Sequence, residues 1–261
     1  MKFKRCLAAV FRDKPIDQIL LKDVKSFKTA RARQKSPRTK RLLRPATVNR
    51  ELALLKHLFS HNDDVVPQNP VRKKGMLLDE DNEQKRVLTP DEERLYLMAC
   101  SQPLQDIAIL MLQCGMRPEE VCRIRRENVH IDEGYLFNPH GKTKAARRDV
   151  WLDEAATAVV SRRLATIKGD YLFPGRVEGQ PIVKVNASHN AAVKRSGVKR
   201  FRLYDLRHTF ASRMNDSGVD VPTLALLLGH AHWHMVKRYV HPSKERQREA
   251  MQKKQRYMAT K

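Results

Sequence analysis

The sequence predicts a mainly α-helical chain with one small antiparallel β-sheet, in which a small all-α first part precedes a larger α+β second part. Three observations support this fold class. Apolar residues recur at helical spacing in most segments, whereas the stretch 129–152 changes to short alternating runs typical of strands. A polar stretch of mixed charge follows Asn69-Pro70 and marks a boundary near residue 84. The expected domains are therefore residues 1–84 and 85–261.

The first part contains an amphipathic helix that begins after Thr47, a residue type favoured at the N-cap. Apolar side chains follow at the spacing of one helical face and are expected in the core: Val48, Leu52, Leu55 and Phe59. The next segment, 71–86, has no apolar stripe and mixes charges, so we expect it to be a linker.

The second part opens with a helix whose start is marked by three residues. Thr89 is the expected N-cap, Pro90 suits the first helical position, and Glu92 completes a capping box. Short strands are expected within 129–152 and at 171–175. Further helices are expected at 102–116, 117–128, 153–167, 186–197, 205–218 and 221–230, with a polar helix in the tail at 242–261.

The charge balance indicates a polyanionic partner. The chain has 52 Lys and Arg against 29 Asp and Glu, which gives a net charge of +23 and a pI of about 10.2. A surface this basic favours polyanions, and nucleic acid is the expected one. No apolar run reaches the roughly 18 residues of a membrane span. The four cysteines form no CxxC pair, which suits a reducing cytoplasm.

Positive charge is concentrated between Lys25 and Arg50, where ten Lys or Arg residues occur without an acidic residue. A solvated basic segment of this kind can follow a phosphate backbone, and a flexible linker is the simpler alternative. We expect these side chains, with Lys144 of the second part, to contact DNA: Lys28, Arg31, Arg33, Lys35, Arg38, Lys40, Arg41 and Arg44.

Three short motifs stand out in the second part. They are CGMRPEEV at 114–121, YDLRHTFA at 204–211 and LLGH at 227–230, and Tyr239 follows nine residues after the last histidine. In this order and spacing, within a basic chain, they resemble the motifs of tyrosine recombinases of the phage integrase family. The resemblance covers the whole second part. It extends more loosely to the first, where DKPIDQI, ATVNREL and NPV resemble the family's core-binding domain. The usual additional first helix of that domain is not recognised here, so we expect either a short member of the family or an N-terminally incomplete domain.

The resemblance implies cleavage and rejoining of DNA without metal, cofactor or ATP. Tyr239 would be the nucleophile that forms a 3′-phosphotyrosyl bond and leaves a free 5′-hydroxyl. Arg117 and Arg207 would stabilise the phosphate oxygens, since a guanidinium group offers a planar pair of donors. His230 would donate a hydrogen bond to the phosphate.

The family uses a lysine on a β-hairpin to protonate the leaving 5′-oxygen. Lys142 matches that position better, and Lys144 is the alternative. The family usually has a histidine three residues before the second arginine, whereas this chain has Tyr204. A phenol can donate a hydrogen bond to the phosphate but is a poor base near neutral pH.

Three further residues are expected to support the reacting groups. Glu120 would buttress the helix that starts at Arg117. His208 would support the site from its place beside Arg207, and His241 would neighbour the nucleophile.

Several alternatives compete with this interpretation. A metal site at His230, His232, His234 and His241 would require a strand, whereas the segment looks helical. A catalytically weakened or inactive integrase-like DNA-binding regulator would carry the same charge, and a type IB topoisomerase would use similar catalytic residues. By resemblance the partner is double-stranded DNA, and the active form is a homotetramer that is joined on DNA through the C-terminal tail, with possible accessory DNA-bending proteins. The expected location is the cytoplasm and nucleoid of a bacterial or phage-derived system, and no membrane partner is expected.

Overall fold

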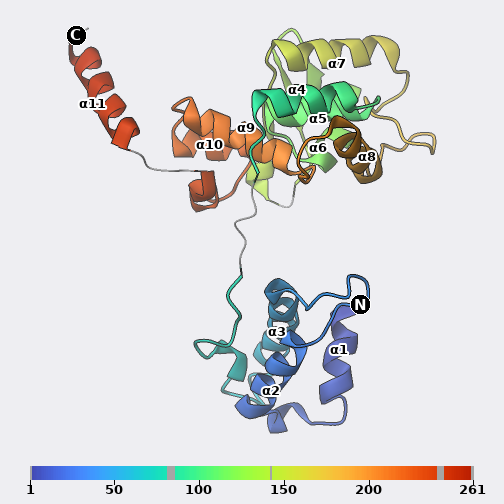
Figure 1. Cartoon of the computed structure of the whole chain (residues 1–261), viewed down its shortest axis with the longest axis vertical. Helices are drawn as coiled ribbons and strands as arrows, with labels where there is room; N and C mark the ends of the chain where they lie inside the picture. The colour runs from blue at the N-terminus through green and yellow to red at the C-terminus, as the bar shows by residue number, and fades with distance from the viewer. Residues whose placement is uncertain (1, 81–85, 142, 240–243, 260–261) are drawn as a thin grey trace. The chain divides into compact units, whose positions relative to one another are not determined.

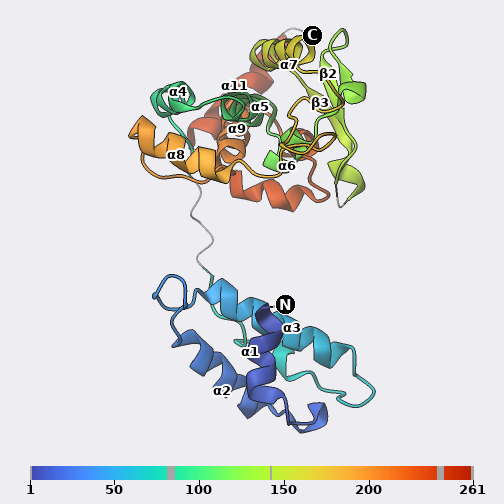
Figure 2. The same cartoon turned by 90° about the vertical axis from the view of Figure 1, so that its right-hand side faces the viewer.

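The computed structural model describes residues 2–80, 86–141, 143–239 and 244–259. The chain divides into two compact units, Met1–Gln84 and Lys85–Lys261. Figures 1 and 2 show the helices of each unit from two directions. None of the described helices is long and apolar enough to cross a membrane.

The first unit is all α-helical. Its elements are α1 (Lys2–Phe11), η1 (Ile16–Gln18), α2 (Leu21–Ala32), α3 (Pro45–Ser60) and η2 (Pro70–Arg72). The predicted apolar face of α3 is buried with Val24 and Phe27 of α2. The helix begins at Pro45, two residues before the predicted cap at Thr47, because proline suits the first helical position.

Residues 70–80 belong to the first unit, so the prediction of a linker over 71–86 is wrong for this part. Val71 and Met76 are buried in the core of the unit. The Asn49 side chain donates to the Leu78 carbonyl and accepts from the Leu78 N–H, both at 2.8 Å. These bonds satisfy the backbone of a segment whose sequence shows no periodic apolar stripe.

The second unit surrounds one central helix, α5 (Leu104–Cys114), which packs against the helices at Glu154–Thr166 and Asp205–Asp216. The other helices are α4 (Pro90–Ala99), α6 (Pro118–Cys122), α7 (Glu154–Thr166), α8 (Asn186–Ser196), α9 (Asp205–Asp216), α10 (Val221–Leu228) and α11 (Lys244–Ala259), with 3-10 turns η3 (Arg126–Asn128), η4 (Lys144–Ala146) and η5 (Trp233–Tyr239). The predicted capping box of α4 is confirmed, since Thr89 and Glu92 exchange hydrogen bonds of 3.2 Å.

A three-stranded antiparallel sheet in the order β1-β2-β3 lies within this unit: β1 (Val129–His130), β2 (Tyr135–Asn138) and β3 (Arg148–Trp151). Leu136 pairs with Val150 and Asn138 with Arg148, which fixes the register of β2 and β3. The predicted fold class is therefore confirmed. The expected strand at 171–175 is wrong: Tyr171 and Pro174 form isolated bridges in the described structure.

Candidate functional site

Arg207 lies at the centre of the predicted site, on α9, and its side chain is completely buried. Its guanidinium group donates to the Gly115 carbonyl at 2.6 Å and to the Leu228 carbonyl at 2.5 Å. These carbonyls lie at the C-terminal ends of α5 and α10, where backbone acceptors have no helical partner. The negative ends of the two helix dipoles favour a cation there.

Glycine is required where α5 ends. Gly115 has a φ of +61°, and a Cβ at this position would lie 2.3 Å from Cδ1 of Phe210. Only glycine can therefore turn the chain here and present its carbonyl to Arg207.

Burial has a large electrostatic effect on Arg207. Burial, helped by the nearby cations Arg117 and Arg148 and opposed by Tyr204, lowers the pKa of the guanidinium group to about 10. Glu120 opposes this effect, and its carboxylate lies 3.8 Å from Nη1 of Arg207. Arg207 Nε is buried and has no hydrogen-bond partner among the described residues.

Arg117 and Glu120 form the second part of the site. Arg117 caps α6, its backbone N–H donates to Glu120 at 2.9 Å, and its Nη1 donates to the same carboxylate at 2.6 Å. Although burial acts against ionisation of Glu120, the cations Arg148 and Arg117 hold its pKa below the usual value. These contacts place Glu120 where it can hold Arg117 in position, as predicted. Its contribution to function is a proposal.

Arg148 is a residue that the sequence analysis missed. It lies on β3, nearly buried, and its guanidinium group is 3.3 Å from the Glu120 carboxylate. Its Nε donates to the Leu227 carbonyl at 2.8 Å, just before the turn that carries His230. The alternation of Arg148 with buried Val150 could have signalled an inward-facing cation.

Tyr204 lies at the two arginines. Its interaction with Arg117 helps to raise the pKa of that arginine, with a smaller effect than that of Glu120. Tyr204 also interacts electrostatically with Arg207. Its ring is 36% exposed, so the phenol is accessible to a ligand.

His230 follows the turn at Gly229 and lies beside Arg207, with its Nε2 3.3 Å from Nη2 of that arginine. A cavity of about 340 Å³ connects His230 and Arg117 with the loop around Gly141 and Thr143. Lys142 lies outside the described residues, and Lys144 is exposed on η4.

The predicted nucleophile, Tyr239, ends η5 and is 2% exposed. Its hydroxyl oxygen lies 2.9 Å from Nδ1 of His208, which is 4% exposed. His241 lies outside the described residues.

The alternating histidines do not converge. The rings of His232 and His234 stack on each other, with centroids 5.3 Å apart, and both side chains are exposed, whereas His230 is buried beside Arg207. In the described part of the chain, no three His, Cys, Asp or Glu residues are grouped so that they could hold a metal ion.

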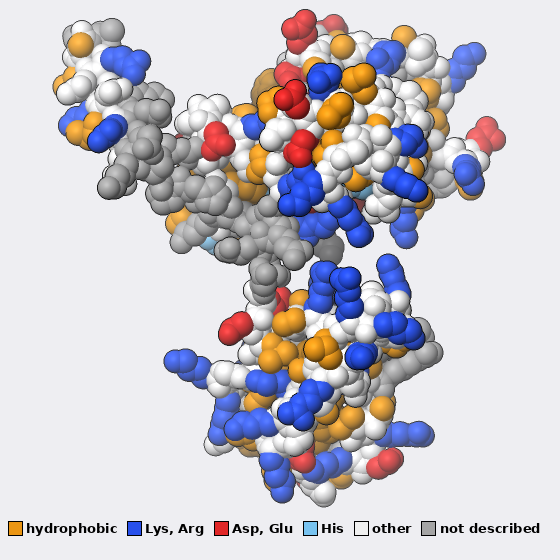
Figure 3. Space-filling model, in the orientation of Figure 1, with side chains coloured by type: hydrophobic (Ala, Val, Ile, Leu, Met, Phe, Trp, Pro, Cys, Tyr) orange, Lys and Arg blue, Asp and Glu red, His pale blue; other side chains and the backbone are white. Residues whose placement is uncertain are grey.

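Most of the basic side chains predicted to contact DNA are exposed in the first unit, and Figure 3 shows many Lys and Arg side chains on its visible face. Lys28 and Arg31 are partly buried. Lys28 donates to the Gly75 carbonyl at 2.9 Å, and Arg31 forms a 2.5 Å ion pair with Glu51, which is 2% exposed. The geometry therefore gives Arg31 a structural role within the unit.

A lysine-lined cavity of about 300 Å³ lies between α2 and the segment after η2. Lys25 and Lys28 line it together with Lys73 and Lys74. The last two were assigned to a linker by the sequence analysis. Only the folding of residues 70–80 onto the unit brings the four cations together.

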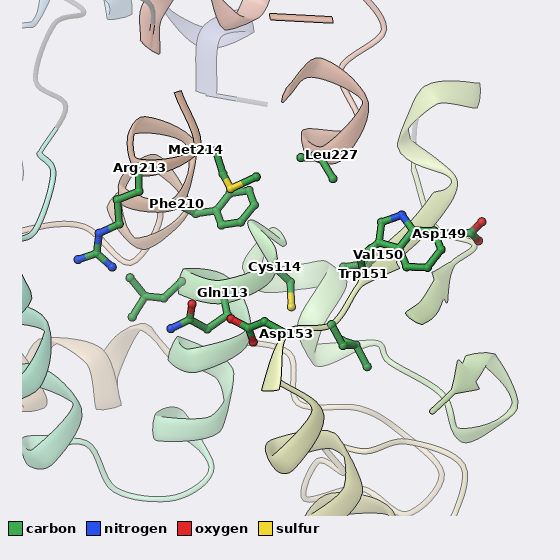
Figure 4. A pocket seen from close by; sticks show the side chains of 12 residues that line it. Gln113, Cys114, Asp149, Val150, Trp151, Asp153, Phe210, Arg213, Met214 and Leu227 are labelled. Atoms are coloured by element: carbon green, nitrogen blue, oxygen red, sulfur yellow. The ribbon is translucent and has the colours of Figure 1, made fainter. Parts of the chain in front are cut away.

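A second cavity in the second unit, of about 390 Å³, is lined by none of the predicted catalytic residues. Figure 4 shows Phe210 and Met214 of α9 at one side and Trp151 of β3 at another, with Cys114 at the end of α5 between them. Asp149 and Asp153 also line it. The cavity is thus mainly apolar, and its charged lining residues are two aspartates and Arg213.

Comparisons with known proteins identify the class to which this fold and site belong. The chain is a member of the phage integrase family, whose model matches residues 85–246. It is 25% identical over 172 residues to the integrase of Salmonella phage P22 and 28% identical over 238 residues to the shufflon-specific DNA recombinase of Escherichia coli. These alignments cover 61% and 87% of this chain but only 44% and 59% of the two relatives.

Solved structures show the same fold at low sequence identity. The Tn1549 transposon integrase, in complex with a circular intermediate DNA, matches with a TM-score of 0.78 at 20% identity, over 96% of this chain and 91% of that one. A λ integrase dimer bound to a core site matches with a TM-score of 0.72 at 17% identity, over 92% and 86% of the two chains.

Proposed function

We propose that this protein is a site-specific DNA recombinase that cleaves and rejoins duplex DNA through a covalent 3′-phosphotyrosyl intermediate. The observation that carries the proposal is that Arg117 and His230 line one cavity and that Arg207 lies 3.3 Å from His230, with Tyr239 nine residues beyond the histidine. Relatives named integrases and DNA recombinases support the class of reaction.

The phosphate is bound by the arginines in this proposal. Three guanidinium groups, those of Arg117, Arg148 and Arg207, surround one carboxylate, so the site keeps a positive charge for an anion. The buried Nε of Arg207 offers a donor to a phosphate oxygen, and hydrogen bonds of this charged kind strengthen as negative charge develops. The Tyr204 hydroxyl donates a further hydrogen bond.

The reaction exchanges one ester bond for another. Oη of Tyr239 attacks phosphorus, the P–O5′ bond breaks, and Lys142 or Lys144 donates a proton to the leaving 5′-oxygen. Because the phosphotyrosyl bond conserves the energy of the phosphodiester, the reverse reaction rejoins the strand without ATP or metal. Residues 1–84 bind the same DNA through their exposed lysines and arginines.

A nicked suicide DNA, taken from the flanks of the host locus, tests this proposal. Incubation with the protein in EDTA should give a covalent protein–DNA adduct on a denaturing gel, and Tyr239→Phe should abolish it. Tyr257→Phe, which changes an exposed tyrosine of α11, is the matched control and should react normally. DNA binding without any adduct would instead identify a regulator that has lost catalysis.

The C-terminal helix is proposed to join protomers into a tetramer on DNA. Met251 and Met258 are exposed on α11 and lie on one side of it, seven residues apart. The helix contains six Lys or Arg residues against two Glu. These features complement the mainly apolar cavity of Figure 4 and its two aspartates, so α11 of a second copy is the proposed occupant.

Replacing both Met251 and Met258 with serine tests this assembly. The variant should bind DNA and form the adduct, but complexes with more than one protomer should be lost on a native gel. Met98→Ser removes an equally exposed methionine from α4 and should change nothing. Unchanged multimers in the double variant would contradict the assignment.

A further inference from the structure

We infer that His208 is the general base that accepts the proton of the Tyr239 hydroxyl during DNA cleavage. This inference rests on the proposed function and adds a catalytic residue to it. Its geometric basis is the 2.9 Å contact between His208 Nδ1 and Tyr239 Oη. A proton acceptor must lie within hydrogen-bond reach of the proton that it removes, and His208 meets this condition.

Tyrosine needs such an acceptor because its ordinary pKa is about 10, so the phenolate is rare at neutral pH. Both members of this pair are shielded from solvent, with 4% of His208 and 2% of Tyr239 exposed. Bulk water is therefore poorly placed to take the proton. An imidazole nitrogen that carries no hydrogen has a lone pair that can accept it.

Tyr204 is not placed for the same role. Its phenol interacts with the guanidinium groups of Arg117 and Arg207. Toward His208 it presents its ring edge-on, with centroids 5.1 Å apart and planes at 70°. Tyr204 therefore serves the phosphate side of the site, and His208 serves the nucleophile.

The proton transfer balances with the ester exchange. In the tautomer that carries hydrogen on Nε2, the Nδ1 lone pair of His208 accepts the phenolic proton while Oη forms its bond to phosphorus. The P–O5′ bond breaks, and the leaving oxygen receives a proton from the lysine of the hairpin. On rejoining, the His208 imidazolium returns its proton to the departing tyrosine oxygen.

The chain contains a matched control for a buried histidine–tyrosine hydrogen bond. His189 Nδ1 lies 2.8 Å from the Tyr96 hydroxyl, and both side chains are buried. His208→Gln and His189→Gln therefore remove equivalent contacts from the same unit. Only the first should change the chemistry.

The test measures the rate of adduct formation on nicked suicide DNA at saturating protein. His208→Gln should be slower than wild type by about 100-fold or more, the usual contribution of a general base, with unchanged DNA binding. His189→Gln should react at the wild-type rate. His208→Asn is a second variant in case the glutamine disturbs folding, which circular dichroism reports.

A substrate with sulfur in place of the bridging 5′-oxygen separates base from acid, because a thiolate leaves without needing a proton. It should restore cleavage to a variant of the hairpin lysine but not to His208→Gln. Equal rates in wild type and His208→Gln would overturn the inference alone. Faster cleavage by His208→Gln would also overturn it, since the contact would then restrain the tyrosine. A wild-type protein that forms no Tyr239-dependent adduct would overturn the proposed function and this inference with it.

Discussion

The second unit contains two clusters of three rings, and in each of them a histidine is hydrogen-bonded to a tyrosine and meets a third ring edge-on. In one, His189 bonds to Tyr96 at 2.8 Å and meets Phe201 edge-on at 5.0 Å. In the other, His208 bonds to Tyr239 at 2.9 Å and meets Tyr204 edge-on at 5.1 Å. The contact between histidine and tyrosine is therefore no mark of function by itself.

The surroundings distinguish the two clusters. The second ring nitrogen of His189 lies 3.1 Å from the Phe201 carbonyl, so its N–H donates there and Nδ1 must accept from Tyr96. Burial raises the pKa of Tyr96 far above its usual value, so this phenol stays neutral. His208, by contrast, follows Arg207 directly on α9, beside the cationic site. The first cluster lies within the core of the unit, and the second contains the proposed nucleophile and follows the proposed phosphate-binding Arg207.

The largest expected difference comes from removing each tyrosine hydroxyl. Tyr239→Phe should eliminate the covalent adduct, because no other group replaces the nucleophile. Tyr96→Phe should keep adduct formation but lower the free energy of unfolding by about 1–3 kcal/mol, since His189 loses a buried partner. Denaturant titration and the suicide-DNA gel measure the two effects. An active Tyr239→Phe would assign the nucleophile elsewhere.

The second difference concerns one arginine on the helix of each histidine, namely Arg207 on α9 with His208 and Arg195 on α8 with His189. Arg207→Lys should slow cleavage by roughly 100- to 1000-fold, because one ammonium group cannot hold two helix-end carbonyls and a phosphate together. Arg195 of α8 also donates to a helix-end carbonyl, that of Ala99 at 2.7 Å, but is exposed. Arg195→Lys should leave cleavage unchanged and alter stability by less than about 0.5 kcal/mol. Single-turnover rates provide the measurement.

The third change makes the two clusters alike. Tyr204→Phe gives the His208 cluster a phenylalanine at the place that Phe201 has in the His189 cluster, and it removes the hydroxyl group next to Arg117. Cleavage should fall about 10-fold, the effect of a lost hydrogen bond of about 1.4 kcal/mol to a charged group. Stability should hardly change, since the ring is 36% exposed. Wild-type rates in this variant would exclude a catalytic role for the hydroxyl.

The smallest expected effect is a dependence of the free energy of unfolding on pH, which comes from His189 in the first cluster. Burial lowers the pKa of His189 below its ordinary value of 6.5, so the unfolded chain binds this proton more readily than the folded one. The stability from the neutral ring is therefore present above pH 6.5 and is lost as the pH falls through the lowered value. Thermal unfolding at pH 7.5 and pH 5 should show a smaller loss for His189→Gln than for wild type. Equal losses would contradict this origin.

Local signals explain how much of the fold was predictable. The capping box at Thr89 and Glu92 acts within four residues, and it was predicted correctly. The apolar stripe of α3 was also read correctly, although its start was misplaced by the choice of Thr47 over Pro45. Residues 70–80 were misread because their order depends on hydrogen bonds to Asn49, which no local periodicity reveals.

The candidate site likewise contains some residues that sequence motifs predict and others that depend on contacts between distant parts of the chain. Motif spacing led to Arg117, Arg207 and His230, which the structure brings together. Arg148 was missed because its partners Glu120 and Leu227 are distant in sequence. The contact of His208 with Tyr239 was missed because it depends on the path of the chain after α10.

The attachment of Arg207 to the ends of two helices has a consequence for the nascent protein. Gly115 is 92 residues before this arginine, and Leu228 is 21 residues after it. A chain still emerging from the ribosome therefore cannot orient its guanidinium group until α10 has been synthesised and has docked. A copy that ends before α10 would therefore keep the contact of Arg207 with Gly115 but lack the contact with Leu228.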